Sequence, residues 1–156
     1  MANICLATRS MTATVFVDTN VLIYALDSGD RFKQRLAQRW RTELWERRRG
    51  RVSYQVLQEF YARVTQKWAG EQQAARDEVL DLLSWQPVII DFVLVESAWR
   101  IQDRYKLSFG EALMVAAAKA ASCEYLLTED MHSGQKVDGV TIVNPFALDP
   151  AQVLGD

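Results

Sequence analysis

The sequence contains very few of the residues that bind soft metals or act as nucleophiles: one histidine, His132, and two cysteines, Cys5 and Cys123. A zinc site made of histidine and thiolate ligands needs more of these residues at closer spacing. A serine or cysteine triad would depend on His132 alone, which makes this type of catalysis a poor fit. Two distant cysteines favour free thiols in a reducing cytoplasm.

Long hydrophobic runs are also missing. No stretch approaches the roughly 20 apolar residues that cross a bilayer, and the opening MANICLATRSMTA lacks both the basic start and the apolar segment of a secretory signal. We therefore expect no membrane association and a cytoplasmic location. We expect residues 1–13 to be an N-terminal extension, its order left open, with Met11 as an alternative first residue. A chain of this length predicts a single domain, over 14–156.

The net charge of −2 is small but unevenly distributed. Residues 31–51 carry nine Lys or Arg and two Glu, a local net charge of +7, which leaves −9 for the rest of the chain. A basic segment suits a polyanionic partner, whereas an acidic remainder suits cations. Arg47, Arg48 and Arg49 are therefore candidate phosphate-binding residues, and a solvated helix face is the open alternative.

Short apolar segments alternate with segments of helical periodicity along the whole chain. This alternation is typical of an α/β fold in which helices cover both faces of a parallel sheet. The pattern predicts strands at 15–17, 52–54, 88–90, 125–128 and 140–143, and helices at 20–26, 32–49, 56–68, 71–85, 93–105 and 108–121. In the second of these helices, Phe32, Leu36, Trp40 and Leu44 form a predicted apolar stripe.

Acidic residues follow several of these strands, at the edge where parallel sheets collect their ligands. Asp18 follows the first strand, Glu59 lies in the helix after the second, and Glu129 and Asp130 follow the fourth. Glu111 lies near the start of the helix that leads into the fourth strand. Two carboxylates about 4 Å apart repel by roughly 4 kcal/mol at an effective dielectric constant near 20. Convergent acids would therefore raise one another's pKa or bind a cation.

Carboxylate ligands without histidine or thiolate favour Mg²⁺ or Mn²⁺, and such ions suit the hydrolysis of phosphate esters. Each acid also has an ordinary structural role open to it. These roles are a helix cap for Asp18, an ion pair with Arg63 for Glu59, a capping box with Ser108 for Glu111 and a loop position for Asp130. The prediction of a metal site therefore depends on the four acids occurring together.

Four segments occur in a characteristic order: VFVDTNVLIYALD, SYQVLQEFYARVT, LSFGEALMVAAAKAASCEYLLTEDMHSGQ and VNPF. Together, over residues 14–146, they resemble the PIN-domain nucleases, and most of all the VapC-type ribonuclease toxins of toxin–antitoxin pairs. The resemblance implies a three-layer α/β/α sandwich with a parallel central sheet and an acidic pocket that binds Mg²⁺ or Mn²⁺. It also implies metal-dependent cleavage of RNA, a homodimer, and inhibition by a cognate antitoxin.

The resemblance assigns roles to individual residues. Asp18, Glu59 and Asp130 match three metal-binding acids of the family. It also matches Asn20, beside the first acid, and Ser53, before the second predicted acid-bearing helix, to polar residues of the family. Separately from the resemblance, we expect Thr128 and Asn20 to orient the ligands or the water, and we expect the positively charged Arg47, Arg48 and Arg49 to contact RNA phosphates.

One position departs from the family pattern. Where the family usually has S-F-W-D, this chain has Ser108, Phe109, Gly110 and Glu111. The extra methylene moves the carboxylate, and Mg²⁺ is demanding about ligand geometry. Glu111 is thus the fourth candidate metal ligand and also the ground for an alternative, a catalytically impaired PIN-like module that binds RNA or protein. A receiver domain or a D-x-D phosphatase fits less well, since Asn20 replaces the second Asp that the phosphatase motif needs.

Overall fold

The computed structural model describes residues 13–156, so most of the expected N-terminal extension lies outside the described residues. Ala13, its last residue, is buried in the core. The elements, in chain order, are β1 (Val15–Val17), α1 (Thr19–Tyr24), α2 (Arg31–Glu46), β2 (Gly50–Arg51), α3 (Tyr54–Lys67), α4 (Gln72–Leu82), the 3₁₀ helix η1 (Leu83–Trp85), α5 (Phe92–Tyr105), α6 (Phe109–Ala120), β3 (Tyr125–Leu127), β4 (Lys136–Val137), β5 (Val140–Val143) and α7 (Pro150–Leu154).

The sheet has five strands in the order β2-β1-β3-β5-β4. β1 pairs in parallel with β2 and with β3, and β3 pairs in parallel with β5. Only the short edge strand β4 runs antiparallel, beside β5. The predicted parallel central sheet is confirmed, and β4 is an addition that its two residues could not signal in the sequence.

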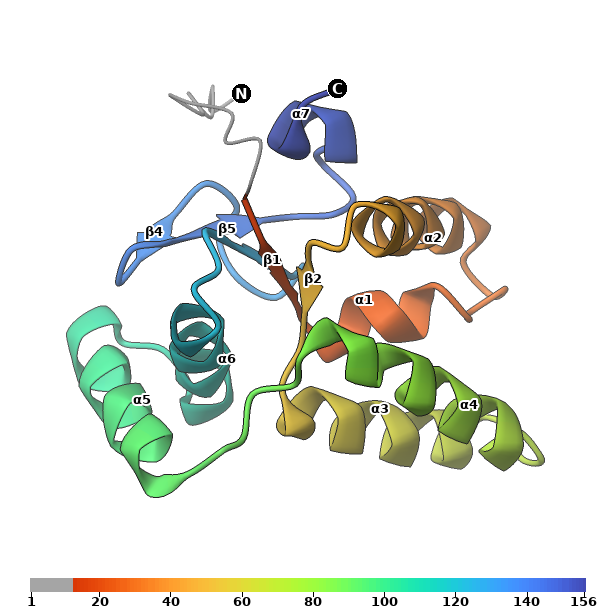
Figure 1. Ribbon diagram of the computed structural model, residues 1–156, viewed down its shortest axis with the longest axis horizontal. Coiled ribbons are helices and arrows are strands. Elements are labelled where there is room, and N and C mark those ends of the chain that lie inside the picture. The colour runs from red at the N-terminus through yellow and green to blue at the C-terminus, as the bar shows by residue number, and fades with distance from the viewer. Residues whose placement is uncertain (1–12) are drawn as a thin grey trace.

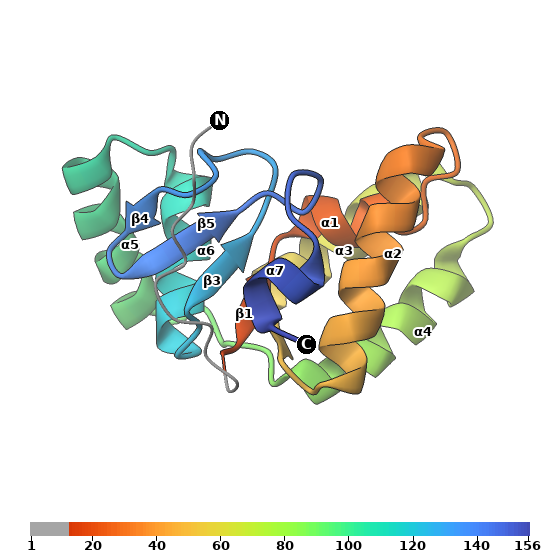
Figure 2. The same ribbon diagram turned by 90° about the horizontal axis from the view of Figure 1, so that it is seen from above.

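Helices cover both sides of this sheet. α2 and α7 lie on one side of β1, β3 and β5, and α5 and α6 lie on the other (Figures 1 and 2). The three residues of β1 and the three of β3 are all buried, as expected for strands covered on both faces. Trp40 of α2 is fully buried, and its Nε1 donates to the carbonyl oxygens of Pro145 and Leu148 at 3.1 and 3.0 Å. The three-layer α/β/α sandwich is therefore confirmed.

No helix within residues 13–156 has both the length and the apolar character needed to cross a membrane.

Two strand predictions were wrong. The segment predicted at 52–54 forms its strand earlier, as β2, and Tyr54 already begins α3. At 88–90 there is only a single bridge between Ser53 and Val88, and Ile89 is 72% exposed. Phe32, placed on the apolar stripe of α2, is 64% exposed. A short apolar run by itself does not show whether its residues face a core, which is why these three positions misled.

Candidate active site at the carboxyl ends of the strands

Parallel pairing in register brings the residues that follow β1, β3 and β5 to one edge of the sheet. These residues are Asp18, Thr128 and Asn144. The row is continued by backbone hydrogen bonds, from Asp18 N to the Leu127 carbonyl at 3.0 Å and from Thr128 N to the Val143 carbonyl at 3.0 Å. Side chains that are more than a hundred residues apart in sequence are thus held next to one another by the sheet itself.

Asp18 caps a helix and also forms a hydrogen bond to the end of a second strand. It caps α1, with its Oδ1 accepting a hydrogen bond from Thr19 N at 2.6 Å. Its Oδ2 accepts a hydrogen bond from Thr128 Oγ1 at 2.8 Å. Thr128 is fully buried, so the carboxylate is held between a helix N-terminus and a rigid strand end. Capping and membership of the site are therefore compatible.

Glu59 reaches the site from the second turn of α3. Ser53 caps this helix, and its buried Oγ accepts a hydrogen bond from a backbone N–H of the first turn at 3.2 Å. The Glu59 carboxylate accepts hydrogen bonds from Thr19 Oγ1 at 3.0 Å and from Gln55 Nε2 at 3.1 Å. Among residues 13–156, Glu59 and Arg63 form no ion pair, so the ordinary surface pair that the spacing suggested does not form. Ser53 acts on the site only by fixing the start of α3.

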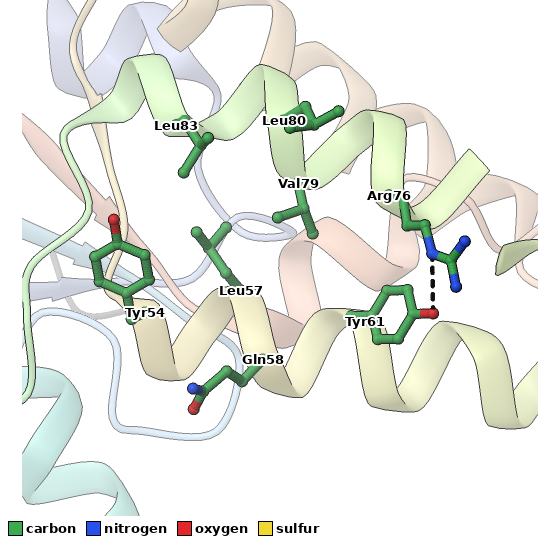
Figure 3. Close-up of a pocket in the computed structure, with 8 residues that line it drawn as sticks. All are labelled: Tyr54, Leu57, Gln58, Tyr61, Arg76, Val79, Leu80 and Leu83. Carbon is green, nitrogen blue, oxygen red and sulfur yellow. Dashed lines mark hydrogen bonds between the residues drawn. The ribbon is translucent and has the colours of Figure 1, made fainter. Parts of the chain in front are cut away.

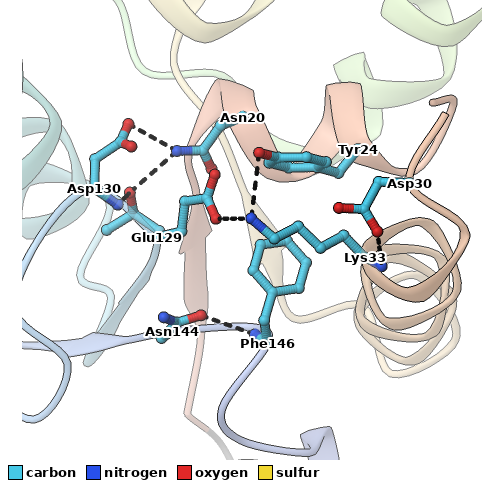
Figure 4. A network of polar contacts seen from close by, with 9 residues as sticks. Asn20, Tyr24, Asp30, Lys33, Glu129, Asp130, Asn144 and Phe146 are labelled. Atoms are coloured by element: carbon cyan, nitrogen blue, oxygen red, sulfur yellow. Dashed lines mark hydrogen bonds and ion pairs between the residues drawn. The ribbon is translucent and has the colours of Figure 1, made fainter.

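Asp130 is joined to the same site through Asn20 (Figure 4) and through Thr128. Asn20 Nδ2 donates to Asp130 Oδ2 at 2.8 Å and, at 3.5 Å, to Thr128 Oγ1. Thr128 Oγ1 also accepts from Asp130 N at 3.2 Å. The Thr128 hydroxyl therefore links Asp18, Asp130 and Asn20.

Glu129, which also follows β3, is drawn away from the other acids. Its carboxylate forms an ion pair with Lys33 of α2 at 2.8 Å (Figure 4). Lys33 Nζ also lies 4.8 Å from the centre of the Tyr24 ring and 5.0 Å from that of Phe146. The pairing with Glu129 raises the pKa of Lys33. The charge of Glu129 is therefore compensated by Lys33 within the protein. Of the two acids that follow β3, Asp130 is the one that remains at the site.

Glu111 lines the same hollow as Asp18, Glu59 and Asp130, a space of about 440 Å³. Its backbone N–H donates to Ser108 Oγ at 3.2 Å, which caps α6. Within the described residues no return bond from the Glu111 carboxylate completes a capping box, so its oxygens are not used there. A Cβ added at the neighbouring Gly110 would meet no atom within 4 Å, so the glycine leaves open space beside the acid.

The electrostatics of the hollow favour a cation. Burial raises the pKa of Asp18 from 3.8 to about 6, hydrogen bonds from Thr128 and Thr19 oppose the rise, and the charges of Asp130 and Glu59 add to it. Asn20 Oδ1 is buried and has no hydrogen-bond partner among residues 13–156. A carboxyl group that is costly to ionise, among other acids, is stabilised in its charged form by a bound cation.

The oxygen donors fit Mg²⁺ or Mn²⁺. Among the described residues, no three Asp, Glu, His or Cys side chains meet the geometry of a metal site as they stand. Mg²⁺ retains several of its waters and often takes only one or two carboxylates directly. The hollow therefore suits a hydrated ion bound by a few of its acids rather than a closed protein cage.

The arginine run lies elsewhere. Arg47, Arg48 and Arg49 directly precede β2, which starts opposite the first residue of β1, so they lie at the amino-end edge of the sheet. Arg47 is also held by Glu43 at 3.0 Å and by the Gly155 carbonyl at 2.9 Å. Contact of these arginines with RNA stays a prediction, and it would take place away from the acid hollow.

A separate hollow of about 500 Å³ lies between α3 and α4 (Figure 3). Its walls are almost wholly apolar, with Leu57, Val79 and Leu80 among them, and Arg76 Nε donates to Tyr61 Oη at 3.3 Å at one end. No acid lines it. It therefore offers no ligands for a metal ion, and the chemistry of the described residues is concentrated at the strand ends.

Three residues of the site were missed by sequence reasoning. Thr19 forms hydrogen bonds to both Asp18 and Glu59, and Gln55 donates a hydrogen bond to Glu59. Lys33 forms an ion pair with Glu129. Thr19 stands between the two recognised residues of the D-T-N motif, so its hydroxyl could have been suspected. Nothing in the sequence pairs Lys33 with a residue 96 positions away.

Comparison with known proteins identifies the family and supports the fold. The family model described as PIN domain matches residues 15–136. A toxin–antitoxin complex from Klebsiella pneumoniae contains a similar chain, with a TM-score of 0.60, 20% identity, and coverage of 85% of this chain and 98% of that one. A chain of VapBC2 from Rickettsia felis, crystallised with a DNA fragment from the promoter, gives a TM-score of 0.53, 13% identity, and coverage of 83% and 96%. Among curated proteins no sequence matches.

Proposed function

The chain belongs to the PIN domain family, and from this premise we propose that it is a metal-dependent endoribonuclease, the toxin of a toxin–antitoxin pair. The observation that carries the proposal is one hollow lined by Asp18, Glu59, Glu111 and Asp130. These acids come from the ends of β1 and β3 and from α3 and α6. Acids from four separate elements meeting at one sheet edge are difficult to explain by helix caps alone.

Several residues in and beside the hollow have roles in the proposed reaction. Asp18, Glu59 and Asp130 would hold Mg²⁺ or Mn²⁺, with Glu111 as the fourth candidate ligand. When bound, the ion would supply an activated water and stabilise negative charge on the phosphate that is cut. Thr128 and Asn20 orient the carboxylates, since Thr128 donates a hydrogen bond to Asp18 and Asn20 donates one to Asp130.

The first test changes the central acid. We expect Asp18→Asn to lower the rate of cleavage of single-stranded RNA in Mg²⁺ by at least about 100-fold, because changes to groups that only support metal ligands already cost up to that factor. EDTA should abolish cleavage by the wild type. The measurement is gel analysis of a labelled RNA. Asp77→Asn, at an exposed position of α4, is the matched control and should cleave like the wild type.

Equal cleavage by the wild type in Mg²⁺, the wild type in EDTA and the Asp18→Asn variant would rule the mechanism out.

A second candidate function rests on Glu111, which stands where the family usually has Asp. An impaired PIN-like module would bind RNA or protein without cutting. The position of the Glu111 carboxylate in the acid hollow favours the nuclease. We expect Glu111→Gln to lower cleavage by roughly tenfold or more and Glu111→Asp to retain it. An inactive wild type that gains cleavage through Glu111→Asp would instead establish the impaired module.

We also propose a cytoplasmic homodimer held inactive by an antitoxin. The similarity to chains of two toxin–antitoxin complexes supports an antitoxin partner, and the homodimer follows from the family resemblance. Light scattering after gel filtration should give twice the chain mass of 17.8 kDa. Addition of the protein encoded by the neighbouring reading frame should suppress RNA cleavage. A monomer, or undiminished cleavage, would contradict the respective part of the proposal.

A further inference from the structure

A second hollow of about 560 Å³ adjoins the acid hollow. The two share Asp130 and Arg63 in their walls, so one leads into the other. The second hollow carries no assigned role. Because it adjoins the acid hollow, it offers space for a part of the substrate that lies beside the reacting group.

Residues of α1 and α3, together with Asp27, Glu129 and Asp130 from neighbouring loops, line this second hollow, here called the α1–α3 groove. On α3, Glu59, Arg63 and Lys67 follow one another at intervals of four residues and so lie on one face of the helix. Asn20 and Tyr24 are spaced in the same way on α1, which packs against α3. From Glu59 to Lys67 the helix rises about 12 Å. The groove therefore runs from the acids outward along α3.

Most cations at the groove are already paired within the protein. Lys67 forms an ion pair with Asp27 at 2.6 Å, and Lys33 forms one with Glu129 at 2.8 Å. Arg63 is exposed and, among residues 13–156, takes part in no ion pair or hydrogen bond through its side chain. The partner that its spacing suggests, Glu59, is bound instead by Thr19 and Gln55. Arg63 is therefore a guanidinium free to bind an outside anion.

The position of Arg63 matters because acids surround it. A polyanion that approaches the acid hollow is repelled by Asp18, Glu59 and Asp130 unless positive charge is supplied. A metal ion in the acid hollow would leave the neighbouring phosphates of the chain without a counter-charge. An arginine side chain binds phosphate oxygens through two parallel N–H donors, which fixes position as well as charge. Arg63 can supply this positive charge at the phosphate next to the one in the acid hollow.

We propose that the α1–α3 groove holds the stretch of single-stranded RNA on one side of the phosphate that is cut, with Arg63 bound to the adjacent phosphate. Ile23 and Tyr24, both half-buried in the wall, provide an apolar side for the sugar and base. This inference rests on the proposed ribonuclease function, and it makes Arg63 a residue that binds substrate and takes no part in metal binding.

The experiment measures binding apart from cleavage. A fluorescein-labelled single-stranded RNA of twelve nucleotides is titrated, in Mg²⁺, into the full chain carrying Asp18→Asn, which should leave the RNA intact. We expect the further change Arg63→Gln to raise Kd by about tenfold and to lower the salt slope of log Kd by about one, as for the loss of one phosphate contact. Arg104→Gln, at an exposed position of α5, is the control and should leave Kd unchanged.

In the otherwise wild-type chain, Arg63→Gln should raise KM for RNA far more than it lowers kcat, because the lost contact lies outside the metal site. Unchanged Kd and salt slope, or an equal effect of Arg104→Gln, would overturn the inference even if the wild type cleaves RNA. Conversely, a wild type that binds RNA through Arg63 but never cleaves it would leave the groove standing and refute the ribonuclease.

Discussion

At the scale of single residues, Asp18 bears the main energetic cost of the site. Its folded-state pKa is about 6, against the usual 3.8, and burial is the main cause. The unfolded chain keeps the usual pKa. At neutral pH the carboxyl group of Asp18 is ionised in both states, and its ionisation costs more free energy in the folded state. A difference of this size corresponds to roughly 3 kcal/mol. Without a bound cation, the ionised Asp18 thus lowers the free energy of unfolding.

The sign of the pH dependence follows from this raised pKa. Above pH 6 the cost is complete, and it fades as the pH falls from 6 towards 4, because there the folded state takes up a proton that the unfolded state does not. We expect Asp18→Asn to be more stable than the wild type by about 2 kcal/mol at pH 7.5 without metal. The gap should close near pH 4. Urea unfolding at several pH values measures it, and two parallel stability curves would show that Asp18 is not the cause.

At the scale of elements, the glycines of β2 and α6 have opposite surroundings. Gly50 of β2 packs under Trp85 of η1, and an added Cβ would lie 2.6 Å from the nearest ring atom. Trp85 is buried at 3% exposure, so it has little room to move. Gly110 in α6 faces open space. The glycine of β2 is therefore required by close packing, whereas the glycine of α6 only weakens its helix.

This contrast gives a matched pair of substitutions. We expect Gly50→Ala to destabilise the fold by about 1–3 kcal/mol through overpacking, and Gly110→Ala to stabilise it by roughly 0.5 kcal/mol through helix propensity. Thermal unfolding measures both. Gly110→Ala should also retain RNA cleavage, since no contact of Glu111 depends on the missing side chain. Equal changes in melting temperature would show that Trp85 does not confine Gly50.

At the scale of the whole molecule, four of the nine basic residues in the segment 31–51 form ion pairs within the protein. Lys33, Arg39, Arg41 and Arg47 each form an ion pair, with Glu129, Asp149, Glu78 and Glu43 respectively. Three of these partners belong to other parts of the chain, so α2 is attached to its surroundings by charge as well as by Trp40. Pairs of this kind contribute about 0–1 kcal/mol each when exposed. Part of the local charge of +7 is thus compensated by acidic residues within the protein.

The acid hollow should link metal binding to the stability of the whole fold. A ligand that binds only the folded state stabilises it, and metal binding must displace the proton that Asp18 holds below pH 6. We expect millimolar Mg²⁺ to raise the melting temperature of the wild type at pH 7.5, and to raise it much less at pH 5. Asp18→Asn should respond weakly at both pH values. An equal rise in both proteins would place the bound metal elsewhere.

The sequence by itself determined the fold class and the set of acids. Buried apolar strands alternating with helices already specify a parallel sheet, and such a sheet brings its carboxyl ends to one edge, so the convergence of Asp18 with Asp130 could be predicted. The tertiary structure decided which side chains bind one another there. Lys33 forms an ion pair with Glu129, and Glu59 accepts hydrogen bonds from Thr19 and Gln55 and forms no ion pair with Arg63 within the described residues. The arginines before β2 lie at the opposite edge of the sheet from the acids. Spacing along a helix describes neighbours within one element, whereas these contacts join different elements and depend on how they pack.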